Sequence, residues 1–138
     1  MTSPTRIRLL TSFDHAQDSG ELVVMLANDI DPVSCKNEIE NARRVELHFP
    51  QFTDGRAYSQ AYLIRRRLRF KGDLRATGDV LADQLIQMER TGFSSAVLKD
   101  GIALSDAQRQ LDRFPAFYQG DIAHEAPFLR ADSSKSEV

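Results

Sequence analysis

The chain has 138 residues and a formal net charge of −2 at pH 7. That length fits one domain with an ordinary hydrophobic core. The small acidic excess argues against general nucleic-acid binding, which needs a basic surface to neutralise phosphates. Cys35 is the only cysteine, so the chain has no internal disulfide and cannot by itself build an all-cysteine zinc site or an iron–sulfur cluster.

The N-terminus carries no targeting pattern. A short mixed stretch follows Met1 in place of an apolar run, so no signal peptide is visible. The longest apolar run covers residues 22–27 and is far too short to span a bilayer. We therefore expect a cytoplasmic protein with no membrane partner.

The first half of the chain alternates strand and helix patterns. Residues 5–11 are a candidate edge strand, and residues 22–27 form a short, continuous apolar run typical of a buried strand. Asp31 followed by Pro32 predicts a helix start, because Asp caps free N–H groups and Pro suits the first helical position. Residues 45–49 predict the next strand.

The following segments continue the alternation. An apolar stripe predicts a helix over residues 57–68. Residues 74–76 are a short strand candidate. The next helix has Asp79 as its predicted N-cap and Gly92 as its predicted left-handed C-cap, with Phe93 folding back on the last turn.

The last ordered segments complete the predicted domain. Residues 94–98 predict a strand, and Ser105 with Gln108 forms a capping-box pattern for a final helix. Strand and helix thus alternate about four times, which predicts an α/β, three-layer Rossmann-like parallel sheet of about four or five strands with about four helices. We expect residues 1–119 to form this single domain and residues 120–138 to be a disordered tail.

Two loops of the predicted sheet gather polar side chains. In open parallel sheets, ligands bind beyond the carboxyl ends of the strands, in the loops that lead into helices. Residues 49–60 and 75–84 are such loops, and they follow consecutive strands, so we expect them to be neighbours in space. Their candidate ligand-binding residues are Asp54, Gly55, Arg56, Tyr58, Ser59, Arg75, Thr77, Gly78, Asp79 and Gln84.

These residue types fit an anion pocket. Each loop opens a helix, and helix N-termini present free N–H groups and a partial positive charge. Arg56 or Arg75 would complete the pocket by bidentate hydrogen bonding to sulfate, sulfite, phosphate or a substrate carboxylate. The alternative is structural: Arg56 with Asp79, or Arg75 with Asp54, would form ion pairs that lock the loops, and Asp79 would only cap a helix. On residue types alone the structural alternative is favoured, because ion pairs and caps are commoner than sites.

Other familiar sites have no motif in this chain. Neither loop is a P-loop or a Gly-x-Gly-x-x-Gly fingerprint, so nothing indicates a nucleotide and the cofactor stays unknown. No pair of histidines has metal-ligand spacing, and we expect no metal site. His48 alternates with apolar neighbours; it would either carry protons or, more commonly, be an ordinary strand residue.

Ordered blocks of the sequence resemble a known family. The blocks are residues 47–59, 72–81 and 83–85 with Met88, followed by the pair at 92–93 and residues 114–119. They resemble a bacterial family of unknown function whose genes typically lie beside those for sulfite reductase and sulfate assimilation. Members are labelled as oxidoreductases involved in sulfite reduction, a label that rests on gene neighbourhood and brings no catalytic residues. Many relatives have Cys where this chain has Thr91, so either the family shares no redox thiol at that position or this member has lost it.

The resemblance implies a pathway and leaves the chemistry open. The first hypothesis is an accessory protein of assimilatory sulfite reduction that binds sulfite reductase, its electron donor or a small sulfur oxyanion through the two loops. The alternative is an enzyme, an oxidoreductase among the options, acting on a small anionic substrate at the same loops. There Arg56 and Arg75 would hold the anion, and Asp54 or Asp79 would serve as acid or base. A flavin- or nicotinamide-dependent reductase is disfavoured by the missing fingerprint.

Overall fold

A computed structural model describes residues 6–18, 20, 22–51 and 53–114. It contains one parallel sheet in the order β1-β5-β4-β3-β2. The strands are β1 (Arg8–Leu10), β2 (Val23–Leu26), β3 (Arg44–Phe49), β4 (Asp73–Gly78) and β5 (Ser95–Val97). Helices connect them, which confirms the predicted α/β, Rossmann-like, three-layer fold.

The helical segments are short. The α-helices are α1 (Ser12–Gln17), α2 (Lys36–Glu40), α3 (Arg56–Tyr62), α4 (Leu85–Thr91) and α5 (Leu104–Asp112). The 3₁₀ segment η1 (Pro32–Cys35) precedes α2, and η3 (Ala82–Gln84) precedes α4. The predicted helix over residues 57–68 begins as α3 and continues as a π-helical segment, η2 (Leu63–Arg67).

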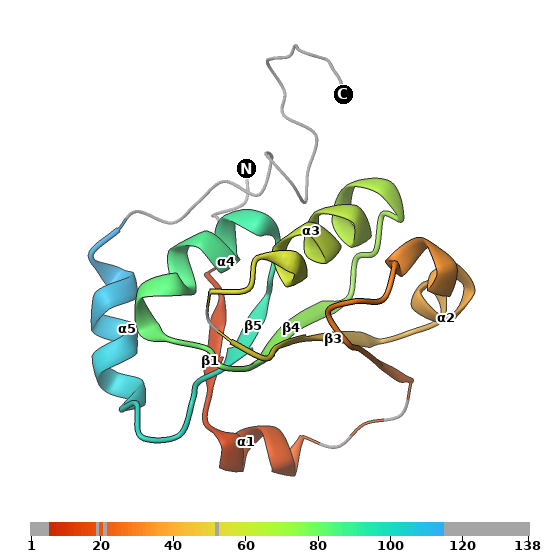
Figure 1. Cartoon of the computed structure of the whole chain (residues 1–138). Helices are drawn as coiled ribbons and strands as arrows, with labels where there is room; N and C mark the ends of the chain where they lie inside the picture. Colours follow the sequence, from red (N-terminus) through yellow and green to blue (C-terminus); the bar gives the residue numbers. More distant parts are fainter. Residues whose placement is uncertain (1–5, 19, 21, 52, 115–138) are drawn as a thin grey trace, which may run out of the picture.

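The strand order places the helices on two faces of the sheet. From β2 to β5 the chain moves one strand at a time in one direction, whereas the step from β1 to β2 crosses the whole sheet in the other direction. Because crossovers between parallel strands are right-handed, this reversal places α1 on the face opposite to α3 and α4. Figure 1 shows α3 and α4 on one side of the sheet and α1 on the other.

The two faces of the sheet differ in polarity. Val45, Leu47 and Phe49 of β3 are fully buried beneath the helices, together with Leu74 and Ala76 of β4. Side chains alternate along a strand, so the charged residues between them lie on the α1 face. We call this the charged face; its central residues are Arg44, Glu46, Asp73 and Arg75. The short helix α1 covers this face only in part, and none of its six residues is buried.

Several local predictions are confirmed. Residues 5–11 contain the edge strand β1, and the run at residues 22–27 contains β2. Asp31 caps η1, where its side chain accepts a 3.0 Å hydrogen bond from the backbone N–H of Val33. Gly92 ends α4 with a φ of 116°, and the N–H of Phe93 donates back to the Met88 carbonyl over 3.0 Å.

Other local predictions are wrong. Asp79 is not a helix N-cap, because it lies in a bend and the next helical segment, η3, begins only at Ala82 with Leu81 as its N-cap. Ser105 does not cap α5, which begins at Leu104 after an N-cap at Ala103 without a side-chain hydrogen bond. The helix α1 was not predicted. The predicted tail at residues 120–138 and the domain end at residue 119 lie outside the described residues.

Candidate functional site

The two predicted loops do lie side by side at the carboxyl edge of the sheet. Phe49 and Gly78, the last residues of β3 and β4, are in register, and the N–H of Asp79 donates to the Phe49 carbonyl over 2.8 Å. Gly78 has a φ of +95°, and a Cβ there would lie 2.3 Å from the Phe49 oxygen. Glycine is therefore needed at this position, both for its backbone angle and for the close approach of the loops.

The first loop is held by Asp54. Its carboxylate accepts hydrogen bonds from Arg56 Nε (3.1 Å), Arg56 Nη2 (2.8 Å) and the Arg56 backbone N–H (3.0 Å). The Asn28 amide also donates to Asp54. The hydrogen bonds from Arg56 lower the pKa of Asp54 to about 2, so this carboxylate is ionised at neutral pH.

An ion pair links the second loop to the segment that follows β5. Lys99, two residues after the end of β5, places its Nζ 2.9 Å from Asp79 Oδ1. The sequence predicted ion pairs between the loops, Arg56 with Asp79 or Arg75 with Asp54. In the structure Arg56 pairs inside its own loop and Asp79 pairs with Lys99. Each loop thus carries an ion pair, but neither of these pairs joins one loop to the other as the structural alternative expected.

Arg75 is not in the loop where the sequence placed it. It is the third residue of β4 and its side chain is fully buried on the charged face. Its guanidinium donates to Asp18 Oδ2 (2.8 Å), Asp73 Oδ2 (3.0 Å) and Ser95 Oγ (3.0 Å). The expectation that Arg75 and Arg56 face one gap is therefore wrong. Strand β4 extends on both sides of residues 74–76, and its alternation turns Arg75 onto the sheet face.

The remaining candidates differ in their access to solvent. Gly55, the N-cap of α3, and Ser59 on its surface are exposed, and Thr77 is half-buried on the charged face. Gln84 Oε1 accepts from the backbone N–H of Leu81 over 3.3 Å. Tyr58 packs its ring against Phe49 and Phe93. Burial, aided by the charge of Asp83, raises the pKa of Tyr58 to about 12, so this side chain is a packing residue.

Charge is segregated between the two edges of the sheet. The loops that follow β2 to β5 contain five aspartates, accompanied by two cations, Arg56 and Lys99. The aspartates are Asp29, Asp31, Asp54, Asp79 and Asp100. Directly after the β4 loop, η3 adds the exposed Asp83 at the same edge, where its charge acts on Tyr58 of α3. The stretches that lead into β3 and β4 contain Arg43 and five further cations: Arg65, Arg66, Arg67, Arg69 and Lys71. The carboxyl edge is therefore acidic and the amino edge basic, an arrangement that complements the helix dipoles.

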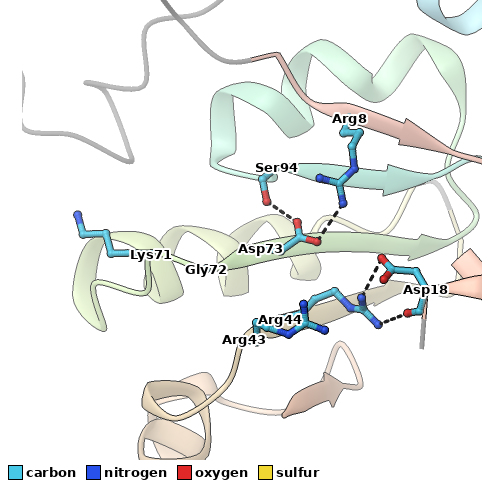
Figure 2. A pocket seen from close by; sticks show the side chains of 8 residues that line it. All are labelled: Arg8, Asp18, Arg43, Arg44, Lys71, Gly72, Asp73 and Ser94. Carbon is cyan, nitrogen blue, oxygen red and sulfur yellow. Dashed lines mark hydrogen bonds and ion pairs between the residues drawn. The ribbon is translucent and has the colours of Figure 1, made fainter. Parts of the chain in front are cut away.

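The basic edge contains a hollow that the sequence did not indicate. We call it the amino-edge hollow; it has a volume of about 560 Å³ and lies on the charged face (Figure 2). Its lining residues are Arg8, Asp18, Arg43, Arg44, Lys71, Gly72, Asp73 and Ser94. The signal that could have revealed it is the alternation in β3 and β4, where charged residues at every second position mark a polar sheet face.

Within the described residues, no three His, Cys, Asp or Glu side chains gather in a way that could hold a metal ion. In the same part of the chain, no helix has the length and apolarity needed to cross a membrane.

Comparison with known proteins gives a family and no characterised relative. No curated protein and no solved structure matches the chain. A model of a family described as "bacterial protein of unknown function (DUF934)" matches residues 23–129. This match spans the sheet from β2 onward, including both loops of the carboxyl edge and most of the amino-edge hollow. The chain therefore belongs to the DUF934 family of bacterial proteins of unknown function.

Proposed function

We propose that the protein is an accessory protein of assimilatory sulfite reduction, which binds a partner protein through the acidic carboxyl edge and turns over no substrate itself. The pathway rests on the resemblance carried by residues 47–59 and 72–81. The mode of action rests on one observation: the carboxylates of both loops are held in ion pairs with neighbouring cations.

The Asp54 carboxylate is a poor acid or base at neutral pH. General acid–base catalysis works best when the pKa of the catalytic group lies near the working pH, whereas the pKa of Asp54 is about 2. The carboxylate of Asp79 is engaged as well, because its Oδ1 lies 2.9 Å from the Lys99 ammonium. The same charges are well suited to docking, because charge complementarity guides association and orients the partner.

The negative charge of the carboxyl edge determines which kind of partner it can bind. Five aspartates against Arg56 and Lys99 make the carboxyl edge acidic, which favours a basic protein surface and opposes a small anion. The partner proposed for this edge is sulfite reductase or its electron donor. The small sulfur oxyanion expected from the sequence fits this edge poorly once Arg75 is placed elsewhere.

An enzyme acting on a small anionic substrate is the second candidate. The observation that favours it is the exposure of Arg56, whose side chain remains 64% accessible although it pairs with Asp54. That guanidinium would have to hold the substrate. The two candidates predict different behaviour of Arg56→Ala, because loss of a substrate-binding cation abolishes turnover whereas loss of one rim charge weakens docking only modestly.

Growth on defined sulfur sources tests the proposal. A strain that lacks this gene should grow poorly with sulfate as its only sulfur source and normally with cysteine. Wild-type protein and Arg67→Gln, which changes one exposed cation away from the carboxyl edge, should restore growth on sulfate. Asp83→Lys, a charge reversal on the exposed surface of η3, should restore it poorly. Normal growth of the deletion strain on sulfate would refute the proposed pathway.

A further inference from the structure

We propose that the amino-edge hollow binds a small, doubly charged oxyanion group such as sulfate or phosphate. The hollow lies at the opposite edge of the sheet from the two loops. The inference does not rest on the proposed function, since it is drawn only from the charges, hydrogen bonds and shape of the hollow. It assigns a ligand class to residues other than the candidates that the sequence suggested.

The lining of the hollow carries an excess of positive charge. Arg8, Arg43, Arg44 and Lys71 stand against Asp18 and Asp73, which gives the lining a net charge of +2. Arg75 adds another cation directly beneath it, and Glu46 adds one carboxylate, which pairs with Arg44 over 2.9 Å. The local field therefore favours an anion.

The two carboxylates of the lining are already occupied. Asp73 Oδ1 accepts from the hydroxyls of Ser94 (2.6 Å) and Ser95 (2.8 Å), and its Oδ2 accepts from Arg75 (3.0 Å). Burial opposes ionisation of Asp73, but these hydrogen bonds and the charge of Arg75 hold its pKa below the usual range. Asp18 Oδ2 accepts from Arg75 (2.8 Å) and Arg44 (3.1 Å). Both negative charges are thus balanced by cations behind them.

Two of the cations are available to a ligand. Arg44 uses Nε for Glu46 and both terminal nitrogens for Asp18. Arg43 and Lys71, in contrast, have exposed side chains with no hydrogen bond or ion pair to any residue that the structure describes. In Figure 2 the guanidinium of Arg43 lies beside Arg44, whereas Lys71 stands at the rim with its ammonium turned outward. The planar fork of Arg43 suits bidentate binding of an oxyanion, and the flexible stem of Lys71 can bring a second charge to it.

The composition of the hollow limits the ligand to a small polar group. Its lining contains no aromatic or aliphatic side chain, so nothing there would bury an acyl chain. Gly72 keeps the entry to β4 close to β3, because a Cβ at this position would lie 2.6 Å from the Arg43 carbonyl oxygen. The hollow is larger than a sulfate ion, which leaves room for bridging water molecules.

Nuclear magnetic resonance of the ¹⁵N-labelled full chain tests the inference. Sodium sulfate and sodium phosphate are titrated at constant ionic strength, which is held with sodium chloride. We expect saturable shifts of the backbone amides of Arg43, Gly72 and Ser94. Arg43→Gln should weaken binding about tenfold, the loss expected for one charge-assisted hydrogen bond. Lys71→Gln should weaken it to a smaller extent, and it provides a second variant if Arg43→Gln fails to fold.

The matched control is Arg67→Gln, which removes an exposed cation of the same basic edge outside the hollow. This variant should bind both anions as the wild type does. Adenosine 5′-monophosphate distinguishes a free anion from a terminal group. If the protein binds adenosine 5′-monophosphate and phosphate with equal affinity, the natural ligand is the free anion. If it binds adenosine 5′-monophosphate more tightly, the natural ligand is a phosphate group on a larger molecule. Both outcomes support the oxyanion site. Absence of saturable shifts in the wild type, or equal weakening by Arg67→Gln, would overturn it.

Discussion

Arg75 Nη2 lies 3.0 Å from Asp73 Oδ2, and the two residues stand side by side on one face of β4. The Arg75 guanidinium is fully buried there and also binds Asp18 and Ser95. Burial of a charged group is costly unless it is paired and hydrogen-bonded. The charged face is therefore a structural unit that fixes α1 to the sheet, with Arg75 at its centre.

Replacement of Arg75 should strongly destabilise the fold. Arg75→Met keeps most of the side-chain volume but leaves Asp18 and Asp73 without their shared partner. Loss of one partner from a buried ion pair costs about 3–5 kcal/mol, which urea denaturation would measure. Arg56→Met is the matched control, because it breaks an exposed pair and should cost no more than about 1 kcal/mol. Equal losses in the two variants would contradict the structural role of Arg75.

The close approach of the two carboxyl-edge loops can be tested at Gly78. Gly78→Ala introduces both an unfavourable backbone angle and a contact of 2.3 Å with the Phe49 oxygen. Gly101 has the same φ of +95°, but a Cβ added there would meet no atom within 4 Å, so Gly101→Ala isolates the backbone term of about 1–2 kcal/mol. Thermal denaturation should show a clearly larger loss for Gly78→Ala. If the two variants lose the same stability, the loops are not in contact at Phe49.

Tyr58 should act through its ring alone. Its hydroxyl oxygen is buried and has no hydrogen-bond partner among the described residues, while its ring lies 5.1 Å from that of Phe49. Tyr58→Phe should keep or slightly raise the melting temperature, because it removes an unsatisfied polar group. Tyr58→Ala should cost about 3–5 kcal/mol through the lost ring packing. A marked loss of stability in Tyr58→Phe would show that the hydroxyl has a partner.

The depressed carboxyl pKa values predict acid sensitivity. Asp54 titrates near pH 2 in the folded chain and at 3.8 when unperturbed, and the pKa of Asp18 is also lowered, mainly by its hydrogen bond from Arg75. A group with a depressed folded pKa contributes stability above its unfolded pKa and loses it as the pH falls toward the folded value. The free energy of unfolding should therefore decline between about pH 4 and about pH 2. Asp54→Asn should make this decline shallower, and a decline as steep as that of the wild type would contradict the prediction.

The sequence predicted the sheet well because its core strands are strongly patterned. The signals that led to correct predictions are local in sequence. They are the apolar runs of β2 and β3, the cap at Asp31 and the turn at Gly92. The helix α1 was missed, although Thr11 and Asp14 form the capping box that starts it. Its six residues bury nothing, so no apolar stripe marked it as a helix.

The candidate site was harder to predict because it depends on distant pairing. Asp79 looks like a helix cap in sequence, but its carboxylate forms an ion pair with Lys99, twenty residues later. Arg75 looks like a loop residue, yet its partner Asp18 lies 57 positions away. Contacts at such separations follow from strand order and register, which local patterns do not specify.

The central claim is that the acidic carboxyl edge docks a partner protein, and direct binding tests it. Purified protein would be titrated against sulfite reductase and its electron donor by biolayer interferometry over a series of salt concentrations. We predict binding to one of the two that weakens as salt increases, that falls about tenfold in Asp83→Lys, and that is unchanged in Arg67→Gln. Absence of binding to both at low salt, or binding that Asp83→Lys leaves intact, would contradict the claim.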